Sequence, residues 1–307
     1  MMQYLGFDTS NYTTSAALFA DGEMYSSRRL LPVKEGQLGL RQSDAVFHHT
    51  AALPEIIAAL PDCRDIAAVG VSDRPRDAEG SYMPCFLTGV SAAACTAKAL
   101  GVPLYTFSHQ AGHIAAAVWS SGRKELLEKE FLAFHVSGGT TEVVHVAPDG
   151  EKVFRASMLL SSLDLKAGQA IDRTGVMLGF PFPAGKYVDA EAQKSTRTFK
   201  IHIRLKDGNC SLSGLQNQCE QMKSRGEPDC DICRYCIEYI GAALSAMADY
   251  ALQSCGTLPL VFSGGVMCNS ILRRELSAEY DSVFADAAYS GDNAAGIAYL
   301  ARIKQSL

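Results

Sequence analysis

The pattern of apolar and polar residues near the middle of the chain predicts two strands joined by a polar turn. Residues 131–136 and 141–147 are apolar and rich in β-formers, and the turn between them reads Ser-Gly-Gly-Thr-Thr from residue 137. A Pro-Asp-Gly turn follows the second run. This pattern is typical of a buried hairpin. Gly138 and Gly139 can adopt a positive φ and bring backbone N–H groups close to an anion.

The same pattern occurs at the N-terminus, where residues 4–20 align without a gap on residues 131–147. The Asp21-Gly22 turn has its counterpart in Asp149-Gly150. The sequence therefore predicts two related halves, each beginning with a strand, a polar turn and a strand. Two such turns facing each other would hold a phosphate chain from both sides. The residues that recur are Leu5, Phe7, Ser10, Thr13, Thr14 and Ala20, as Leu132, Phe134, Ser137, Thr140, Thr141 and Ala147.

Elsewhere, short apolar runs that predict strands alternate with longer amphipathic or small-residue runs that predict helices. This order indicates an α/β fold with a mixed sheet in each half, and the central cleft between two lobes is then the expected site. We expect a surface loop at 72–84 and a rigid turn at 180–185. The predicted strands are residues 23–29, 66–71, 102–107, 199–205 and 258–262, and the predicted helices are residues 47–60, 87–100, 110–120, 167–178, 236–254, 270–279 and 292–303.

Composition narrows the class of protein. A length of 307 residues fits one large domain or two of about 150 residues each. The net charge of −5 argues against a broad basic face for nucleic acid, although it leaves room for a local patch. No apolar run approaches the roughly 18 residues of a membrane span, so we expect no membrane association. The ten cysteines, with no secretion signal, predict reduced thiols in a cytoplasmic protein.

Two histidines form the first candidate for chemistry. His109 and His113 lie four residues apart at the start of a predicted helix, and this spacing places both imidazoles on one face. They could share a metal ion, which needs at least one further ligand. Alternatively, one of them caps or packs the helix and the other is exposed. Asp292, at the start of the last predicted helix, could complete a His-His-Asp set or simply serve as an N-cap.

Two other segments could bind a nucleotide. The segment Ser263–Asn269 reads Ser-Gly-Gly-Val-Met-Cys-Asn between a strand and a helix, where a helix N-terminus offers free N–H donors. Its glycines could equally serve the strand-to-helix turn alone. Asp172 is a polar residue on an otherwise apolar helix, and it could hold a ribose hydroxyl or pair with Arg173.

The cysteine cluster is the most unusual feature. Cys230, Cys233 and Cys236 lie three residues apart, a spacing suited to Zn²⁺ or an iron–sulfur cluster. Cys219 or Cys210 could supply a fourth thiolate. The run leads directly into a predicted helix, however, so the thiols could instead share one helix face. Both interpretations stay open at this point.

Six motifs lie in a fixed order along the chain: SHQAGH, HVSGGTT, AGQAIDRTGVMLGFPFPAG, SLSGL, SGGVMCNSILRREL and GDNAAGIA. Taken together they resemble one known family over nearly the whole chain, and most strongly from His109 to Ala298. The chain resembles the TsaD family, also called Gcp or YgjD, which belongs to the sugar kinase, chaperone and actin superfamily. The fold that this resemblance implies is itself duplicated and actin-like.

The resemblance implies an acyltransferase that moves threonylcarbamoyl from its adenylate to an adenosine beside the tRNA anticodon. It further implies one divalent metal, Fe or Zn, and an adenine nucleotide, either ATP or the acyl-adenylate. The partners implied are tRNA, a small TsaB-like paralogue and an ATPase. By resemblance, the metal ligands are His109, His113 and Asp292, and the nucleotide and phosphate contacts are His135, Val136, Ser137, Gly138, Gly139, Asp172, Gly185 and Asn269.

The chain departs from the family pattern at several positions. An acidic pair in the first turn is replaced by Tyr12 and Thr13, and a Gly-Pro-Gly loop by residues 73–84. These differences indicate a diverged paralogue. Further replacements are Gln110-Ala111 for a glutamate between the histidines, Thr140 for a histidine and Gln216 for a lysine.

The departures keep a second function class open, a nucleotide-binding regulatory or scaffold protein without transfer activity. A metallopeptidase is less favoured, because the sequence contains no HExxH motif. We expect residues 1–107 with 287–307 to form the N-terminal lobe. Residues 108–286 would form a second lobe that carries most metal and nucleotide contacts.

Overall fold

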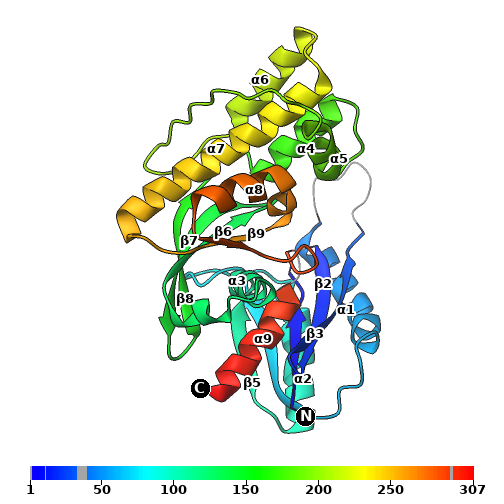
Figure 1. Cartoon of the computed structure of the whole chain (residues 1–307). Helices are drawn as coiled ribbons and strands as arrows, with labels where there is room; N and C mark the ends of the chain where they lie inside the picture. Colours follow the sequence, from blue (N-terminus) through cyan, green and yellow to red (C-terminus); the bar gives the residue numbers. More distant parts are fainter. Residues whose placement is uncertain (1, 11, 33–39, 291–292) are drawn as a thin grey trace. The chain divides into compact units, whose positions relative to one another are not determined.

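The computed structural model describes residues 2–10, 12–32, 40–290 and 293–307. Within it the chain divides into two compact units (Figure 1). Unit 1 comprises Met1–Glu128, Ala147–Ala156 and Ala288–Leu307, and unit 2 comprises Lys129–Val146 and Ser157–Ala287.

Unit 1 is built on a five-stranded sheet in the order β3-β2-β1-β4-β5. The first three strands form an antiparallel meander, and the last two run parallel to β1 or to each other. The strands are β1 (Gln3–Asp8), β2 (Thr13–Ala20), β3 (Glu23–Leu30), β4 (Ile66–Arg74) and β5 (Leu104–Ser108). The helices are α1 (Gln42–Ala58), α2 (Phe86–Leu100), α3 (His109–Ser120), η1 (Lys124–Glu128) and α9 (Asn293–Ser306).

Alternation along β1 decides which helices cover which face of this sheet. Leu5 and Phe7 belong to a buried cluster with Leu53 and Ile56 of α1 and Ala93 of α2. The intervening glycine of β1 points to the opposite face, where α9 packs. Because successive side chains of a strand point to opposite faces, one short strand contributes to both layers.

The layer formed by α3 and α9 depends on glycine. A Cβ on Gly296 would lie 1.8 Å from the carbonyl oxygen of Gly112 on α3, and a Cβ on Gly6 would lie 2.4 Å from the carbonyl oxygen of Ala294. Real Cβ atoms do not approach that closely, so only glycine allows α9 to lie directly against both β1 and α3. This packing explains a difference from the predicted lobes: residues 108–128 lie in unit 1, because α3 is fixed to α9.

Unit 2 repeats the strand order of unit 1. Its sheet reads β10-β9-β6-β7-β8, so β6, β7 and β8 correspond to β1, β2 and β3, while β9 and β10 correspond to β4 and β5. The β6–β7 pair is antiparallel and the β6–β9 pair is parallel, as in the matching pairs of unit 1. The strands are β6 (Phe131–Val136), β7 (Thr141–Asp149), β8 (Val153–Ser161), β9 (Leu260–Ser263) and β10 (Ser282–Phe284).

The predicted duplication is therefore confirmed, as is the α/β fold with two mixed sheets. The hairpin of β7 and β8 is long, and its tip, Ala147–Ala156, groups with unit 1. The helices of unit 2 are α4 (Ala167–Met177), α5 (Gly185–Ala192), α6 (Ser213–Ser224), α7 (Asp229–Cys255), η2 (Gly265–Cys268) and α8 (Ser270–Glu279).

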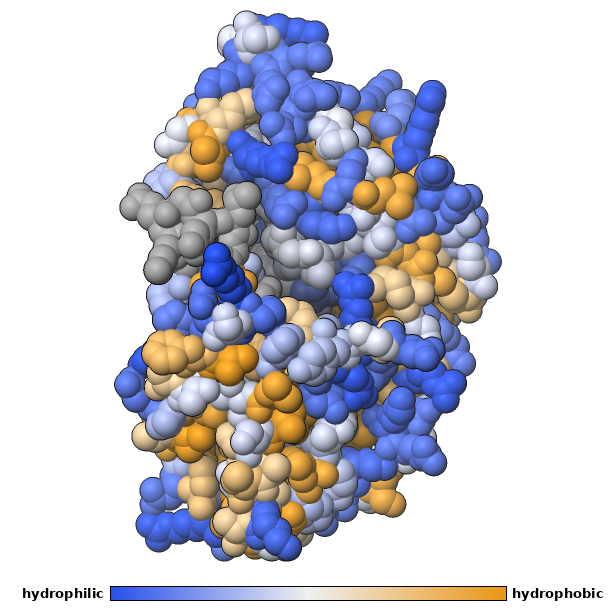
Figure 2. Space-filling model, turned by 180° about the vertical axis from the view of Figure 1, so that it is seen from behind, coloured by the Kyte–Doolittle hydropathy of each residue, from blue (hydrophilic) through white to orange (hydrophobic). Residues whose placement is uncertain are grey.

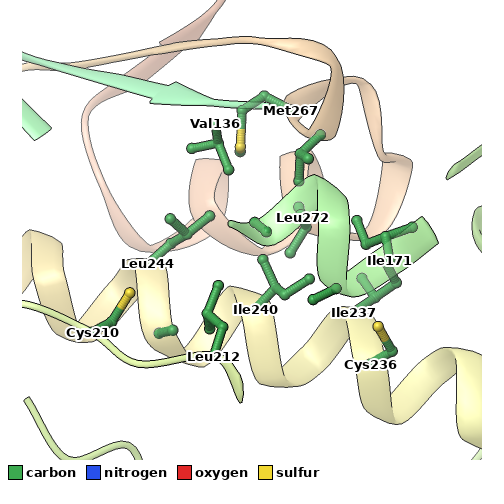
Figure 3. Packing of buried hydrophobic residues seen from close by; sticks show 14 of the residues in the cluster. Val136, Ile171, Cys210, Leu212, Cys236, Ile237, Ile240, Leu244, Met267 and Leu272 are labelled. Carbon is green, nitrogen blue, oxygen red and sulfur yellow. The ribbon is translucent and has the colours of Figure 1, made fainter. Parts of the chain in front are cut away.

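The core of unit 2 forms where α7 packs against α4, α6 and α8. Figure 3 shows Ile237, Ile240 and Leu244 of α7 pointing toward Ile171 of α4 and Leu272 of α8. All five of these side chains are buried. Burying an aliphatic side chain of this size contributes roughly 1.5–3 kcal/mol. The long helix α7 is therefore the element that joins the other helices of unit 2.

Two predicted elements differ most from the structure. Residues 199–205, predicted as a strand, pair with no strand of the described chain, and their alternating pattern instead reflects packing of one side on the core of unit 2. The helix predicted from Cys236 begins seven residues earlier, at Asp229. Pro228 comes directly before it, where a missing N–H costs no helical hydrogen bond.

The surface offers no broad apolar face in the view of Figure 2, where hydrophobic residues form separate areas among hydrophilic ones. Within the described ranges, no helix has the length and apolar character needed to cross a lipid bilayer.

The contact between α3 and α9 generates the first prediction. Gly296→Ala should lower the free energy of unfolding of unit 1 by about 2–3 kcal/mol, because the added methyl group must displace backbone atoms. The measurement is urea unfolding followed by circular dichroism. The control is Gly214→Ala on α6, where a Cβ has open space. That variant should be about 0.5–1 kcal/mol more stable than the wild type, and equal stability of both variants would contradict the packing argument.

Candidate functional site

The first candidate site lies in unit 1, at the carboxyl end of the sheet. Asp8 ends β1, and Ser72 lies on β4, the parallel neighbour of β1. His109 is the first residue of α3, and Ser108 caps that helix by accepting a hydrogen bond from the N–H of Ala111. The strand ends and the helix start therefore bring a carboxylate, a hydroxyl and an imidazole together.

Asp8 is the centre of this site. Its side chain is 1% exposed. The Nδ1 atom of His109 lies 2.8 Å from Oδ2, the hydroxyl of Ser72 donates to the same oxygen at 2.7 Å, and the N–H of Ser10 donates to Oδ1 at 2.9 Å. Burial by itself raises the pKa of Asp8, but the charge of His109 and the hydrogen bonds from His109, Ser10 and Ser72 lower that pKa to about 2. Asp8 is therefore ionised at neutral pH.

An ionised Asp8 determines which nitrogen of His109 can bind a ligand. A carboxylate only accepts hydrogen bonds, so Nδ1 of His109 must carry the proton. In the neutral ring Nε2 then holds a lone pair, as in the carboxylate–histidine pairs that orient metal ligands. The side-chain amide of Asn293 lies 3.3 Å from Nε2, which fits a donor facing that lone pair.

His113 lies on the same face of α3, one turn after His109, as predicted. The two rings meet edge to face with centroids 4.8 Å apart. The carbonyl oxygen of the Asn293 side chain is buried and has no hydrogen-bond partner within the described part of the chain. Two imidazoles with an adjacent buried oxygen fit the ligand preference of Zn²⁺ or Fe²⁺.

The third predicted ligand, Asp292, lies outside the described residues. Among the residues that are described, no three or more His, Cys, Asp or Glu side chains group as metal ligands. The His-His-Asp site therefore stays a prediction. Sequence reasoning missed Asp8 and Ser72, whose only signal was a polar residue at the end of an apolar run.

The second candidate site is a cavity of about 560 Å³ in unit 2. Its size is within the range of small-molecule sites. It is lined where three helices begin: Gly168 lies near the start of α4, Gly185 starts α5, and Asn269 caps α8. The full lining is Ser137, Gly138, Gly168, Ile171, Asp172, Pro183, Gly185, Lys186, Asp189, Gly265, Val266, Cys268 and Asn269.

The polar turn after β6 forms one wall of this cavity. The hydroxyl of Ser137 accepts hydrogen bonds from the N–H groups of Gly139 and Thr140, at 3.2 and 3.1 Å. Neither glycine of the turn has a positive φ, so the expected left-handed conformation is not used. A Cβ at Gly138 or Gly139 would meet no atom within 4 Å. Glycine here leaves room above the turn.

Two aspartates hold other parts of the cavity lining in place. Asp172 accepts a hydrogen bond from the N–H of Ala184 at 2.8 Å, which fixes the turn before α5. It does not pair with Arg173, whose guanidinium donates to Gln216 instead. Asp189, which sequence reasoning missed, accepts from the side-chain amide of Asn269 at 3.0 Å.

Asn269 has a second role as the N-cap of α8. Its side-chain oxygen accepts hydrogen bonds from the N–H groups of Ile271 and Leu272, at 3.0 and 3.1 Å. The glycine before η2 is structural: Gly264 has a φ of +96°, and a Cβ there would lie 2.3 Å from the carbonyl oxygen of Val136. Gly265, the next residue, lines the cavity.

The predicted nucleotide residues divide into two groups. Ser137, Gly138, Asp172, Gly185 and Asn269 line the cavity together. Three others lie beside it: Val136 is fully buried, Gly139 continues the turn, and the Nδ1 atom of His135 lies 3.1 Å from the hydroxyl of Ser263.

Comparisons with known proteins identify the family. The sequence profile of the family described as "TsaD: tRNA N6-adenosine threonylcarbamoyltransferase" matches residues 38–299. The chain belongs to the TsaD family. A relative from Streptococcus suis with that name is 31% identical over 97% of this chain and 90% of its own length, and one from Salinibacter ruber is 29% identical over 97% and 92%. The predicted membership is confirmed, and the family's name describes an acyltransferase.

Solved structures confirm the fold that TsaD membership implies. Full-length HypF matches with a TM-score of 0.62 at 12% identity, over 99% of this chain and 55% of that chain. Component A of the (R)-2-hydroxyglutaryl-CoA dehydratase from Acidaminococcus fermentans matches with a TM-score of 0.58 at 15% identity, over the full length of both chains. At such identities the likeness concerns the fold alone.

The positions where this chain departs from the TsaD pattern have defined surroundings. Gln216 lies on α6 and bonds Arg173 and Glu220 at 2.9 Å each. The hydroxyl of Thr140 lies 2.9 Å from that of Ser137, within the turn that lines the cavity. Both replacements are therefore part of local hydrogen-bond networks in unit 2.

The structure places the three clustered cysteines along one helix and not around a common metal position. Cys230, Cys233 and Cys236 all lie on α7, and the last two are fully buried. Figure 3 shows the sulfur of Cys236 pointing toward α4 among aliphatic side chains. The structure favours the alternative of a shared helix face, because Cys233 and Cys236 pack into the core of unit 2, while Cys230 is half-buried. No group of three thiols suited to a metal exists among the described residues.

The thiols also differ in acidity. Burial raises the pKa of Cys233 to about 12, and neighbouring carboxylates add to this effect. Cys236 pairs with Cys219, a contact that lowers the pKa of Cys219 and raises that of Cys236, with burial adding to the rise. A thiol with a raised pKa is a poor metal ligand and a poor nucleophile, because only the thiolate reacts.

This placement predicts a labelling pattern. At pH 7 a maleimide should modify the exposed Cys95 and Cys268 of the native protein, while Cys233 and Cys236 react only after denaturation. Peptide mass spectrometry with and without a chelator measures this. Labelling of Cys233 and Cys236 that appears only after chelation would restore the metal interpretation.

Proposed function

We propose that this chain transfers a threonylcarbamoyl group from its adenylate to the N6 amine of an adenosine in tRNA. In this reaction the amine forms a bond to the carbamoyl carbon, the bond from that carbon to the AMP phosphate oxygen breaks, and the amine loses a proton. The observation that carries the proposal is the family match across residues 38–299, with named transferases aligned over nearly their whole length.

We assign the adenylate to the cavity of unit 2. Three helix N-termini at one cavity form a favourable site for an anion, since each directs the positive end of its helix dipole toward the cavity. Lys186 adds a positive charge to the lining. Asp172 and Asp189 offer carboxylate oxygens for ribose hydroxyls. The open space above Gly138 leaves room for the phosphate beside the turn.

We assign a divalent metal to the site of unit 1, with His109, His113 and Asp292 as its ligands. A bound metal would supply Lewis-acid polarisation of a carbonyl oxygen. The role of Asp8 would be to hold the proton on Nδ1 of His109 and so direct Nε2 to the metal. The Ser72 hydroxyl would keep Asp8 ionised and in place.

The family comparisons do not favour the regulatory alternative, because the relatives are named as transferases. We further propose a cytoplasmic protein that acts with a TsaB-like paralogue and an ATPase, as the resemblance implies. Transfer should be tested with threonylcarbamoyl-adenylate, tRNA and those partners, and the modified nucleoside detected by mass spectrometry. Its absence, together with tight binding of adenine nucleotide, would favour the regulatory class over transfer.

A cavity-filling variant tests the nucleotide assignment. Gly138→Leu should weaken binding of AMP about tenfold or more, because the side chain occupies the space above the turn. Isothermal titration calorimetry measures the affinity. Gly150→Leu, also in open space but outside the cavity lining, should bind like the wild type. Equal affinity of all three proteins would contradict the assignment.

The metal assignment is tested through Asp8 rather than through a ligand. Asp8→Asn should lower the affinity for Zn²⁺ about 10–100-fold, since the imidazole loses the charge that orients it. Competition with a chromogenic chelator measures this. Asp62→Asn removes an exposed carboxylate and should leave the affinity unchanged. If Asp8→Asn unfolds the chain, His109→Gln serves as the second variant, and full metal affinity in either folded variant would contradict the assignment.

A further inference from the structure

Residues 199–206, here called the basic strap, form an extended segment with two different sides. Lys200, His202, Arg204 and Lys206 are exposed. The residues between them are apolar and half-buried: Phe199, Ile201, Ile203 and Leu205. Strict alternation of this kind places all cationic side chains on one side of the segment.

The cations of the strap have no carboxylate partner among the described residues. None of the ion pairs within 4 Å in the described chain includes Lys200, His202, Arg204 or Lys206. Cations close by in the fold behave differently, since Arg197 pairs with two carboxylates and Arg234 with two more. In a protein with a net charge of −5, a row of unpaired positive side chains is a local feature that stability does not require.

The strap is held firmly although it belongs to no sheet. At its start, the N–H of Phe199 donates to Glu238 of α7 at 3.1 Å, and the Phe199 ring meets Tyr235 edge to face with centroids 5.1 Å apart. Just beyond its end, the side chain of Asn209 accepts from the N–H of Ser161 on β8 at 2.8 Å. Figure 1 shows the segment running beside α7.

These anchors present the positive side chains in a fixed row. In extended chain, alternate residues are about 6.6 Å apart. Lys200, Arg204 and Lys206 carry positive charge at pH 7, and cations on one side of an extended segment fit the backbone of a nucleic acid, which has one phosphate per nucleotide. Phe199, Ile203 and Leu205 pack against the core of unit 2 and Ile201 is half-buried, so the strap has no exposed apolar row to insert into a lipid surface, which disfavours a membrane.

We propose that the basic strap binds the phosphate backbone of the RNA acceptor. This inference rests on the proposed function for the kind of nucleic acid, while the charge pattern and the anchoring come from the strap itself. Phosphate contacts orient an RNA and carry no base information, so the strap would position the acceptor rather than select its sequence.

The test replaces three cations of the strap together, in the variant Lys200→Gln, Arg204→Gln and Lys206→Gln of the full chain. The probe is an unmodified tRNA transcript, titrated by fluorescence anisotropy at several salt concentrations. Affinity should fall about tenfold or more, and the slope of log affinity against log salt should become less negative by about 1 for each phosphate that the variant no longer neutralises. The affinity for an unrelated single-stranded RNA should fall by a similar factor.

A matched control removes the same charge elsewhere, through Lys98→Gln, Lys124→Gln and Lys129→Gln, all at exposed positions. It should keep the wild-type affinity and salt slope. The charge-conserving double variant Lys200→Arg with Arg204→Lys should bind RNA like the wild type. Unchanged RNA affinity and an unchanged salt slope in the glutamine variant would overturn the proposal. A glutamine variant that no longer binds anionic vesicles but binds RNA like the wild type would overturn it as well.

Failure of the strap and failure of the proposed function give different results. If the glutamine variant still modifies tRNA with a wild-type KM, the strap proposal is wrong and transfer stands. If the wild type binds RNA through the strap but never modifies it, transfer is wrong and the strap stands. AMP affinity should be the same in the wild type and the glutamine variant, which shows that the cavity is intact.

Discussion

The buried charge of Asp8 constrains unit 1 more than any other single group. An ionised carboxylate that is 1% exposed must be matched by hydrogen bonds or by charge, because burial of an unpaired charge costs several kcal/mol. His109, Ser72 and the N–H of Ser10 supply that match. Three elements that are far apart in the sequence therefore meet at one carboxylate. Because Asp8 holds the proton on Nδ1, Nε2 is the nitrogen of the neutral His109 ring that could bind a metal.

Unit 2 uses the same strand order for a different purpose. Where unit 1 places a carboxylate at the end of its first strand, unit 2 places the turn from Ser137 to Thr140, whose hydroxyls bond one another. Around that turn three helices begin, and their N-termini surround an open cavity. One ancestral strand order has thus produced a site suited to a cation in one unit and a site suited to an anion in the other.

In two segments the spacing of residues along the chain was compatible with two different structures. The spacing of Cys230, Cys233 and Cys236 suits a metal site and a helix face equally, and packing against α4 and α6 decided for the helix. The alternation at 199–205 suits a strand and also a segment that rests on a helix. That segment pairs with no strand of the described chain. Its alternation therefore reflects inner residues that pack on the core around α7 and outer residues that face solvent.

By itself the sequence determined the duplication, most of the strands and helices, and the family, and the resemblance to that family named five of the residues that line the cavity. These follow from local signals: apolar period, glycine turns and motifs within a few residues of each other. Only the tertiary structure decided that Asp8 orients His109, that Asp189 holds Asn269, and that residues 108–128 lie in unit 1. Each of these depends on contacts across about 80 residues or more, or on the close approach of α3 and α9 that Gly112 and Gly296 permit. Such contacts leave no periodic trace in the chain, because they are fixed by which surfaces meet after the helices and strands have formed.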